Sequence, residues 1–307
     1  MIAMKIKESS SKINYQQTLI VFAVSAALLT IMRIFQVKTA IDAATGFYTG
    51  TDFLVVAFYI LVAASCAYIA VSSFVSCDSK NVTLKNKKSA AMFWLSLIYS
   101  FTLFYDGVSS FIKSVFTTGD TQVTGTVFKS LMTSGAIPLF LQSIFAVLSG
   151  VFFIELSFSF KKGNGSIGKH RILALMPVGW VSCRLLHLFV RKISFLKVSD
   201  LFLDLSMCAF MALFFMAFAQ VSSDVYSTDS RWRIIGFGIP AALISAIVSI
   251  PRLFYTIVDK STYINENHPF NITDLVFLVF MAILALQFLK KDEPAAPCEK
   301  EETEVVS

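Results

Sequence analysis

The fold is decided by residues 53 to 75, which read FLVVAFYILVAASCAYIAVSSFV. This run contains no Asp, Glu, Lys or Arg, and about twenty apolar residues are what an α-helix needs to cross the hydrocarbon of a bilayer. Lipid offers the backbone no hydrogen-bonding partner, so the polar groups of a spanning segment must be satisfied within it. The stretch therefore predicts a transmembrane helix.

Seven further segments of similar length are also mainly apolar. One of them precedes residues 53–75 and six follow. The chain is 56% hydrophobic over its 307 residues, which is more than a water-soluble surface tolerates. The sequence therefore predicts an all-α fold, a polytopic transmembrane helical bundle of about eight membrane-spanning helices arranged as antiparallel hairpins. The other seven helices are expected near residues 17–35, 90–112, 137–160, 171–190, 201–221, 233–255 and 270–289.

The chain is expected to form a single integral membrane domain over residues 1–290. Lys290 and Lys291 follow the last apolar segment, and the residues after them are rich in Pro, Ala and acidic side chains. A segment of that composition does not bury a core. We therefore expect residues 291–307 to be a disordered acidic cytoplasmic tail, available to a protein partner.

Basic residues between the apolar segments predict the orientation. Lys and Arg accumulate in cytoplasmic connections, and an inside amino terminus places the larger share of them there, Lys5 and Lys85 included. Both termini are then cytoplasmic in a plasma membrane protein, although Arg191, Lys192 and Lys197 run against the rule. Anionic lipid headgroups explain the net charge of +6. The expected partner is therefore the lipid bilayer, with no nucleic acid.

Three predicted helices carry an Arg toward their outer ends, and the helix that follows each of them starts with an Asp. An antiparallel hairpin places a residue near the end of one helix beside a residue near the start of the next. This geometry predicts that Arg184 pairs with Asp204 and that Arg252 pairs with Asp274. The Arg residues are Arg33, Arg184 and Arg252, and the Asp residues that follow them are Asp52, Asp200 with Asp204, and Asp274.

A charge inside a bilayer is costly, so these side chains are expected to meet each other, water or a ligand. One interpretation makes the pairs structural staples between helices. In the other, the Arg residues face a central cavity open to the outer side and hold an anionic ligand, because a guanidinium matches a carboxylate bidentately. The candidate ligand-binding residues are Arg33, Asp106, Arg184, His187, Asp204 and Arg252.

Polar residues also recur at helical spacing inside the predicted helices. Arg184 and His187 share a face of the fifth helix, and Asp106 lies well within the third. For Asp106, either a proton or cation relay or a salt bridge to Arg184 or Arg252 is expected. His187 and Asp204 would form either an acid and base pair or an interhelical hydrogen bond. Interhelical packing alone also accounts for such stripes, so both interpretations stay open.

Small residues on the seventh predicted helix indicate close helix packing. Gly238, Ala242 and Ala246 repeat every four residues, and such side chains let two helix backbones approach one another in a membrane. This pattern predicts packing and carries no chemistry.

Motifs of soluble enzymes and metal sites are missing from the sequence. It contains no H-E-x-x-H, no G-x-S-x-G and no P-loop. His170, His187 and His268 lie on separate segments with no carboxylate at metal-ligand spacing. We therefore expect no catalytic residue, no bound metal and no cofactor.

Three functions fit these observations. The first is a permease or exporter for a small anionic or zwitterionic solute, favoured by the intramembrane charges. The second is a non-transporting sensor or scaffold subunit that acts through partners. The third is an intramembrane enzyme acting on a lipid-linked substrate, and the absence of a catalytic motif makes it the least favoured.

Overall fold

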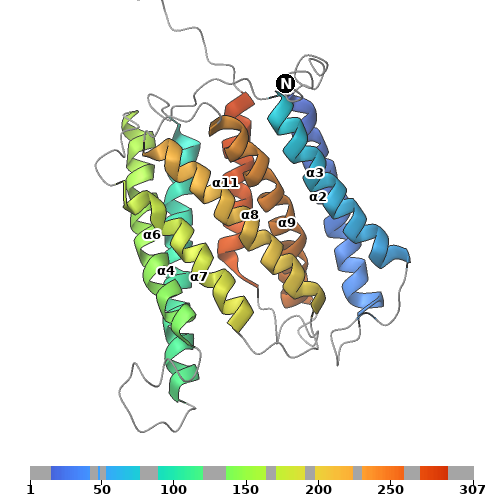
Figure 1. Ribbon diagram of the computed structural model, residues 1–307, viewed down its shortest axis with the longest axis horizontal. Coiled ribbons are helices and arrows are strands. Elements are labelled where there is room, and N and C mark those ends of the chain that lie inside the picture. Colours follow the sequence, from blue (N-terminus) through green and yellow to red (C-terminus); the bar gives the residue numbers. More distant parts are fainter. Residues whose placement is uncertain are drawn as a thin grey trace, which may run out of the picture.

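The computed structural model describes residues 15–41, 48, 53–76, 89–119, 136–163, 171–190, 198–223, 230–258 and 270–289. In these ranges the chain is helical and contains no strand (Figure 1). The predicted all-α fold is confirmed, and each of the eight predicted segments contains one α-helix. The helices are α2 (Tyr15–Thr39), α3 (Phe53–Ser76), α4 (Ala90–Gly119), α6 (Ile137–Lys162), α7 (Met176–Val190), α8 (Val198–Ser222), α9 (Ser230–Val258) and α11 (Ile272–Leu289).

Helix α9 forms the centre of the bundle. It packs directly against α2, α3, α8 and α11, whereas α4, α6 and α7 continue the bundle on the far side of α8 and α11 (Figure 1). In the most apolar window of α9, 89% of the residues are buried, against 22% in the corresponding window of α2. The composition of α9 suits this place, because serines and small residues pack well between helices in lipid.

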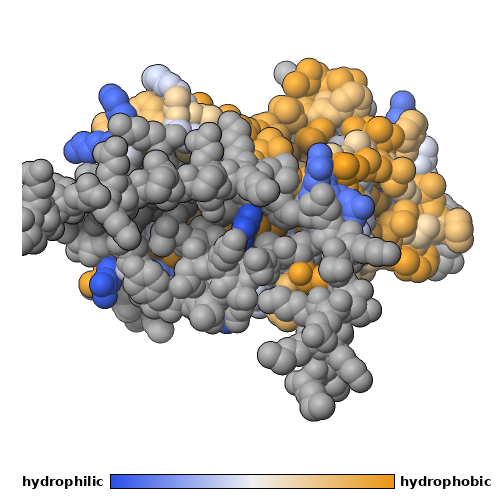
Figure 2. All heavy atoms as spheres, turned by 90° about the horizontal axis from the view of Figure 1, so that it is seen from above, coloured by the Kyte–Doolittle hydropathy of each residue, from blue (hydrophilic) through white to orange (hydrophobic). Residues whose placement is uncertain are grey.

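The outer faces of the bundle are hydrophobic. Large apolar side chains such as Val24, Ile60 and Phe101 are exposed, and Figure 2 shows hydrophobic residues gathered on the side where α2 and α3 stand. A water-soluble protein does not expose apolar surface on this scale. Among the helices that the structure describes, six are long and apolar enough to cross a membrane, and α7 and α11 are shorter apolar helices. The protein is therefore an all-α helical membrane bundle.

Two helix boundaries differ from the sequence prediction by five residues or more. Helix α4 continues seven residues past Ile112 to Gly119, because no helix breaker occurs before that glycine. The predicted helix at 171–190 begins later, with a short 3-10 turn at Leu173–Leu175 and then α7 from Met176. Pro177 explains the shift, since a residue without a backbone N–H is favoured only in the first turn of an α-helix.

The predicted close packing of α9 is confirmed at Gly238. A Cβ at that position would lie 2.2 Å from Cε of Met281 on α11 and 2.9 Å from a ring carbon of Phe214 on α8. Ala242 and Ala246, one and two turns further on, are also buried. The space that a side chain at position 238 would take is therefore already filled by side chains of α8 and α11.

Candidate functional site

Each of the three arginines singled out in the sequence contacts an aspartate on another helix. Arg33 on α2 contacts Asp200 on α8, and Nη2 of Arg252 on α9 lies 2.9 Å from Oδ2 of Asp204 on α8. Arg184 on α7 binds Asp274 on α11 with two hydrogen bonds, of 2.5 and 2.7 Å. We call these three contacts the ion-pair layer. All of them lie at the end of the bundle where α2, α7 and α9 terminate.

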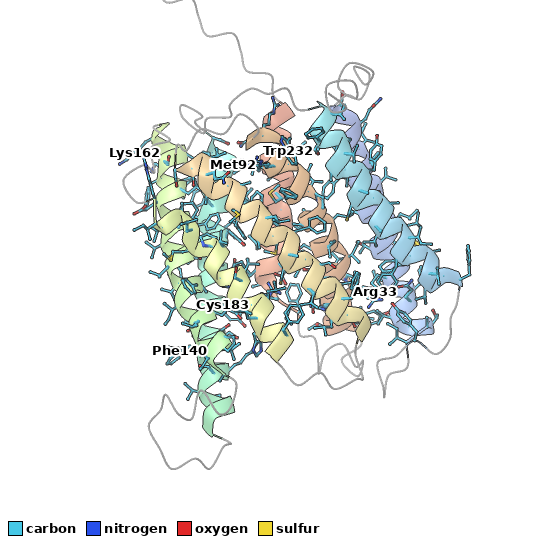
Figure 3. All side chains as sticks on the ribbon, in the orientation of Figure 1. Arg33, Met92, Phe140, Lys162, Cys183 and Trp232 are labelled. Atoms are coloured by element: carbon cyan, nitrogen blue, oxygen red, sulfur yellow. The ribbon has the colours of Figure 1, made fainter. Side chains whose placement is uncertain are left out.

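Figure 3 shows this placement. Arg33, and Cys183 next to Arg184, lie in one half of the bundle, and Lys162 and Trp232 lie at the opposite end. The three pairs are largely buried, with side-chain exposures between 1% and 13%. Buried charges are retained only where a partner of opposite charge and further hydrogen bonds offset their desolvation. The layer therefore joins five helices by contacts that water hardly reaches.

The predicted pairing of the arginines is wrong in its partners. Arg184 contacts Asp274 instead of Asp204, and Arg252 contacts Asp204 instead of Asp274. The prediction assumed that each Arg meets an Asp on the helix that follows its own, which is α8 for Arg184 and α11 for Arg252. In the structure Arg184 instead faces α11 and Arg252 faces α8. Side-chain direction, which depends on how each helix is rotated about its axis, decides the partner.

Arg33 is held by several groups at once. Its guanidinium donates a 2.8 Å hydrogen bond to the hydroxyl of Tyr48 and a 3.3 Å bond to the side-chain oxygen of Gln36, besides contacting Asp200. The hydroxyls of Tyr48 and Tyr59 lie 3.2 Å apart. Tyr48 was not among the candidate ligand-binding residues, because it lies outside the apolar segments in which those residues were sought.

Asp106 sits in a separate cluster of neutral donors. Its carboxylate accepts hydrogen bonds from Nε1 of Trp180 at 2.7 Å, Nε2 of Gln142 at 3.2 Å and Nδ2 of Asn271 at 3.5 Å. These four residues, the Asp106 cluster, come from α4, α7, α6 and the start of α11. The expected salt bridge of Asp106 to Arg184 or Arg252 is therefore wrong, because those arginines face Asp274 and Asp204. Gln142 is a polar side chain within a long apolar segment, and this is the signal by which the sequence could have identified it.

The ion-pair layer and the Asp106 cluster form one electrostatic system. Cys208 on α8 is close enough to interact with Arg184, Asp274, Asp204 and Arg252, and Arg184 also interacts with Asp106. Among the described residues, the buried or largely buried charged groups are three arginines and four aspartates, so carboxylates outnumber guanidiniums by one.

His187 lies one helical turn beyond Arg184 on α7 and is partly buried. Oδ2 of Asp204 contacts Nη2 of Arg252, and the predicted pair of His187 with Asp204 stays a prediction. Five of the six candidate residues, Arg33, Asp106, Arg184, Asp204 and Arg252, therefore belong to the charged system. A ligand-binding role for any of the six remains a prediction. In the described part of the chain no group of His, Cys, Asp and Glu has the arrangement of a metal site.

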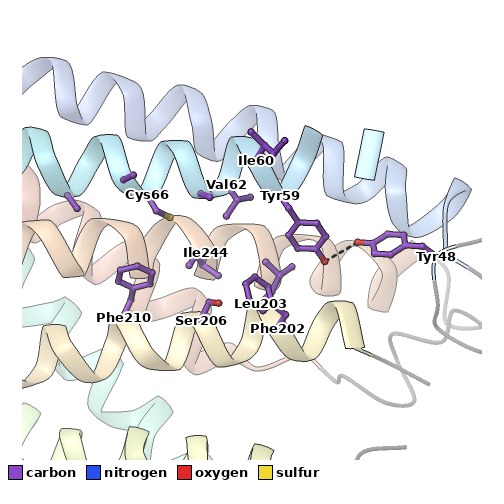
Figure 4. Close-up of a pocket in the computed structure, with 13 residues that line it drawn as sticks. Tyr48, Tyr59, Ile60, Val62, Cys66, Phe202, Leu203, Ser206, Phe210 and Ile244 are labelled. Atoms are coloured by element: carbon purple, nitrogen blue, oxygen red, sulfur yellow. Dashed lines mark hydrogen bonds between the residues drawn. The ribbon is translucent and has the colours of Figure 1, made fainter. Parts of the chain in front are cut away.

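A cavity of about 950 Å³ lies on the flank of the bundle, apart from the Asp106 cluster (Figure 4). It runs between α3 and α8, with Ile244 of α9 at its floor, and it is lined almost entirely by apolar side chains. We call it the lateral groove. One of its ends is polar, because Tyr48 and Tyr59 line it there.

Comparison with known proteins finds no family model, no curated protein and no solved structure that matches this chain. The fold defines the class, an all-α membrane bundle, and the function has to be argued from the site itself.

Proposed function

We propose that this membrane protein is a permease or exporter for a small zwitterionic solute, with the ion-pair layer as the part that opens and closes. The proposal rests on one observation. Arg33 joins α2 to α8, and Arg184 joins α7 to α11, although the two helices of each pair hardly touch otherwise in the described residues. The charges therefore hold together helices that do not otherwise pack against each other.

The stability of the folded bundle is a weak explanation for buried ion pairs at these positions. Replacing a buried ion pair by apolar residues of similar volume is often neutral or stabilising, and apolar packing between membrane helices is available at no desolvation cost. Ion pairs at helix interfaces are, however, the contacts that are broken and re-formed when subunits or domains rotate. Ion pairs between helices that otherwise hardly touch, at one end of the bundle, are therefore suited to a part of the protein that moves.

The charge count supports a zwitterion over a simple anion. Each guanidinium already contacts a carboxylate, so a lone carboxylate on a solute would compete with Asp200, Asp204 or Asp274 and leave that aspartate buried without its partner. A solute that carries both an ammonium and a carboxylate replaces both members of a pair at once. Asp106 supplies an additional carboxylate near Arg184 for the ammonium.

Flux across vesicles of purified protein tests this function. Radiolabelled alanine, succinate and choline represent a zwitterion, a dianion and a cation, and uptake is compared with that of protein-free vesicles. We expect alanine uptake to exceed the protein-free level and to exceed that of the other two solutes. Equal uptake of all three solutes with and without protein contradicts the proposal.

Arg184→Lys identifies the site, because it keeps the charge but loses the two parallel hydrogen bonds to Asp274. Lys162→Ala, a change at the opposite end of the bundle, is the matched control. We expect a drop of about tenfold in alanine uptake for Arg184→Lys, the cost of roughly one charged hydrogen bond, and no change for Lys162→Ala. Unchanged uptake in Arg184→Lys contradicts a role for the ion-pair layer.

A further inference from the structure

We propose that the lateral groove is a binding site for one hydrocarbon chain of a bilayer phospholipid, with the polar part of that lipid at Tyr48 and Tyr59. The site is separate from the Asp106 cluster, and its occupancy does not depend on transport. Three observations carry the proposal: the shape of the groove, its position in the membrane and its polar end.

The groove exists because small side chains face it from both walls. Helix α3 contributes Ala63, Ala67 and Ala70 at helical spacing, and α8 contributes Ser206 between the larger Phe202 and Phe210. The two helices both pack on α9 but hardly on each other. The missing side-chain volume leaves an opening of about 950 Å³, which is near the upper end of the range of roughly 300–1,000 Å³ for small-molecule sites.

The groove lies where acyl chains are found. Both α3 and α8 are long and apolar enough to cross the membrane. Two residues that line the groove, Ile60 and Phe202, are 62% and 56% exposed, so the groove opens to the outside of the bundle. Along α3 the lining runs from Tyr59 to Ala70, about 16 Å at a rise of about 1.5 Å per residue. This length matches one leaflet of hydrocarbon, which is half of about 30 Å.

The polar end selects an amphipathic molecule over a plain hydrocarbon. The hydroxyls of Tyr48 and Tyr59 lie 3.2 Å apart, and Arg33 donates to Tyr48. Tyrosine is enriched at membrane interfaces because its ring is apolar and its hydroxyl bonds to polar groups. Ester and phosphate oxygens of a phospholipid are acceptors for such hydroxyls, whereas the rest of the groove offers an acyl chain an apolar lining.

Native mass spectrometry of the full chain, after incubation in micelles with phosphatidylcholine, tests the proposal. Ala67→Phe fills the groove, and Ala64→Phe places the same ring on an exposed position of α3 outside the lining. We expect wild type and Ala64→Phe to retain a phosphatidylcholine molecule that Ala67→Phe loses. If Ala67→Phe does not fold, Ser206→Leu narrows the groove from the facing wall and is expected to lose the lipid as well.

The polar end is tested separately by Tyr59→Phe, which removes one hydroxyl and leaves the apolar walls intact. We expect this variant to bind phosphatidylcholine several-fold more weakly than wild type does. Three results overturn the proposal. They are a wild type that retains no lipid, equal retention by wild type and by a folded groove-filling variant, and a dimer that disappears in Ala67→Phe, because a second copy would then occupy the groove.

Discussion

Removing one partner of the Arg252 and Asp204 pair is expected to destabilise the bundle, and removing both is expected to restore most of the loss. The pair has an N to O distance of 2.9 Å and side-chain exposures of 7% and 6%. With charge centres about 4 Å apart and an effective dielectric constant of about 20, the attraction is about 4 kcal/mol. Breaking a buried pair by removing one member costs about 3–5 kcal/mol. We therefore expect Arg252→Met and Asp204→Leu each to lower the free energy of unfolding by about 3 kcal/mol.

The double variant Arg252→Met with Asp204→Leu lacks both charges, so neither is left buried alone. Its free energy of unfolding is expected to lie within about 1–2 kcal/mol of wild type, since an apolar pair of similar volume is often neutral or stabilising. Reversible unfolding by SDS in mixed micelles measures all four proteins, and the coupling energy follows from the thermodynamic cycle.

A second cycle is the control, because it combines Arg252→Met with Asp274→Leu. Asp274 is the partner that chain order predicts for Arg252, but in the structure it contacts Arg184. We expect a clearly smaller coupling in this second cycle than in the first, because Asp274 interacts with Arg252 only at longer range and its direct partner is Arg184. The reasoning is refuted if Arg252 couples more strongly to Asp274 than to Asp204, or if both single variants cost less than about 1 kcal/mol.

Two further predictions concern packing and the Asp106 cluster. Gly238→Ala is expected to lower the free energy of unfolding by about 1–3 kcal/mol through overpacking. Gly236→Ala, whose added Cβ would have no neighbour closer than 3.5 Å, should leave the free energy of unfolding unchanged or raise it by up to about 1 kcal/mol in the same SDS assay, because alanine favours a helix more than glycine does. Trp180→Phe removes a 2.7 Å hydrogen bond to the buried carboxylate of Asp106 and is expected to cost about 1.5–3 kcal/mol. Trp94→Phe, at a 60% exposed site, should leave the midpoint of thermal unfolding unchanged, and equal shifts in the two Trp variants would contradict the role of that bond.

The fold class and the helix positions follow from local sequence. A segment in lipid must satisfy its backbone polar groups internally, so twenty apolar residues such as 53–75 specify a helix without reference to the rest of the chain. The presence of Arg33, Arg184 and Arg252 within such segments also predicted that each would meet an opposite charge, water or a ligand, because an unpartnered charge in the bilayer is costly. Both conclusions depend on the free energy of transfer of a segment from water to lipid, and this quantity is set by the residues of that segment alone.

The order of the helices, the partners of the charges and the lateral groove were decided only by tertiary structure. Lipid and helix neighbours are both apolar, so hydropathy does not tell that α9 is central or that α2 lies at the edge. Which Asp an Arg meets depends on how each helix is rotated and on which helices adjoin it, and chain order misassigned Asp204 and Asp274. The lateral groove likewise forms only because α3 and α8 both pack against α9 but hardly against each other. Packing between segments that are distant in the sequence determines the helix arrangement, the ion-pair partners and the groove, and no single segment contains this information.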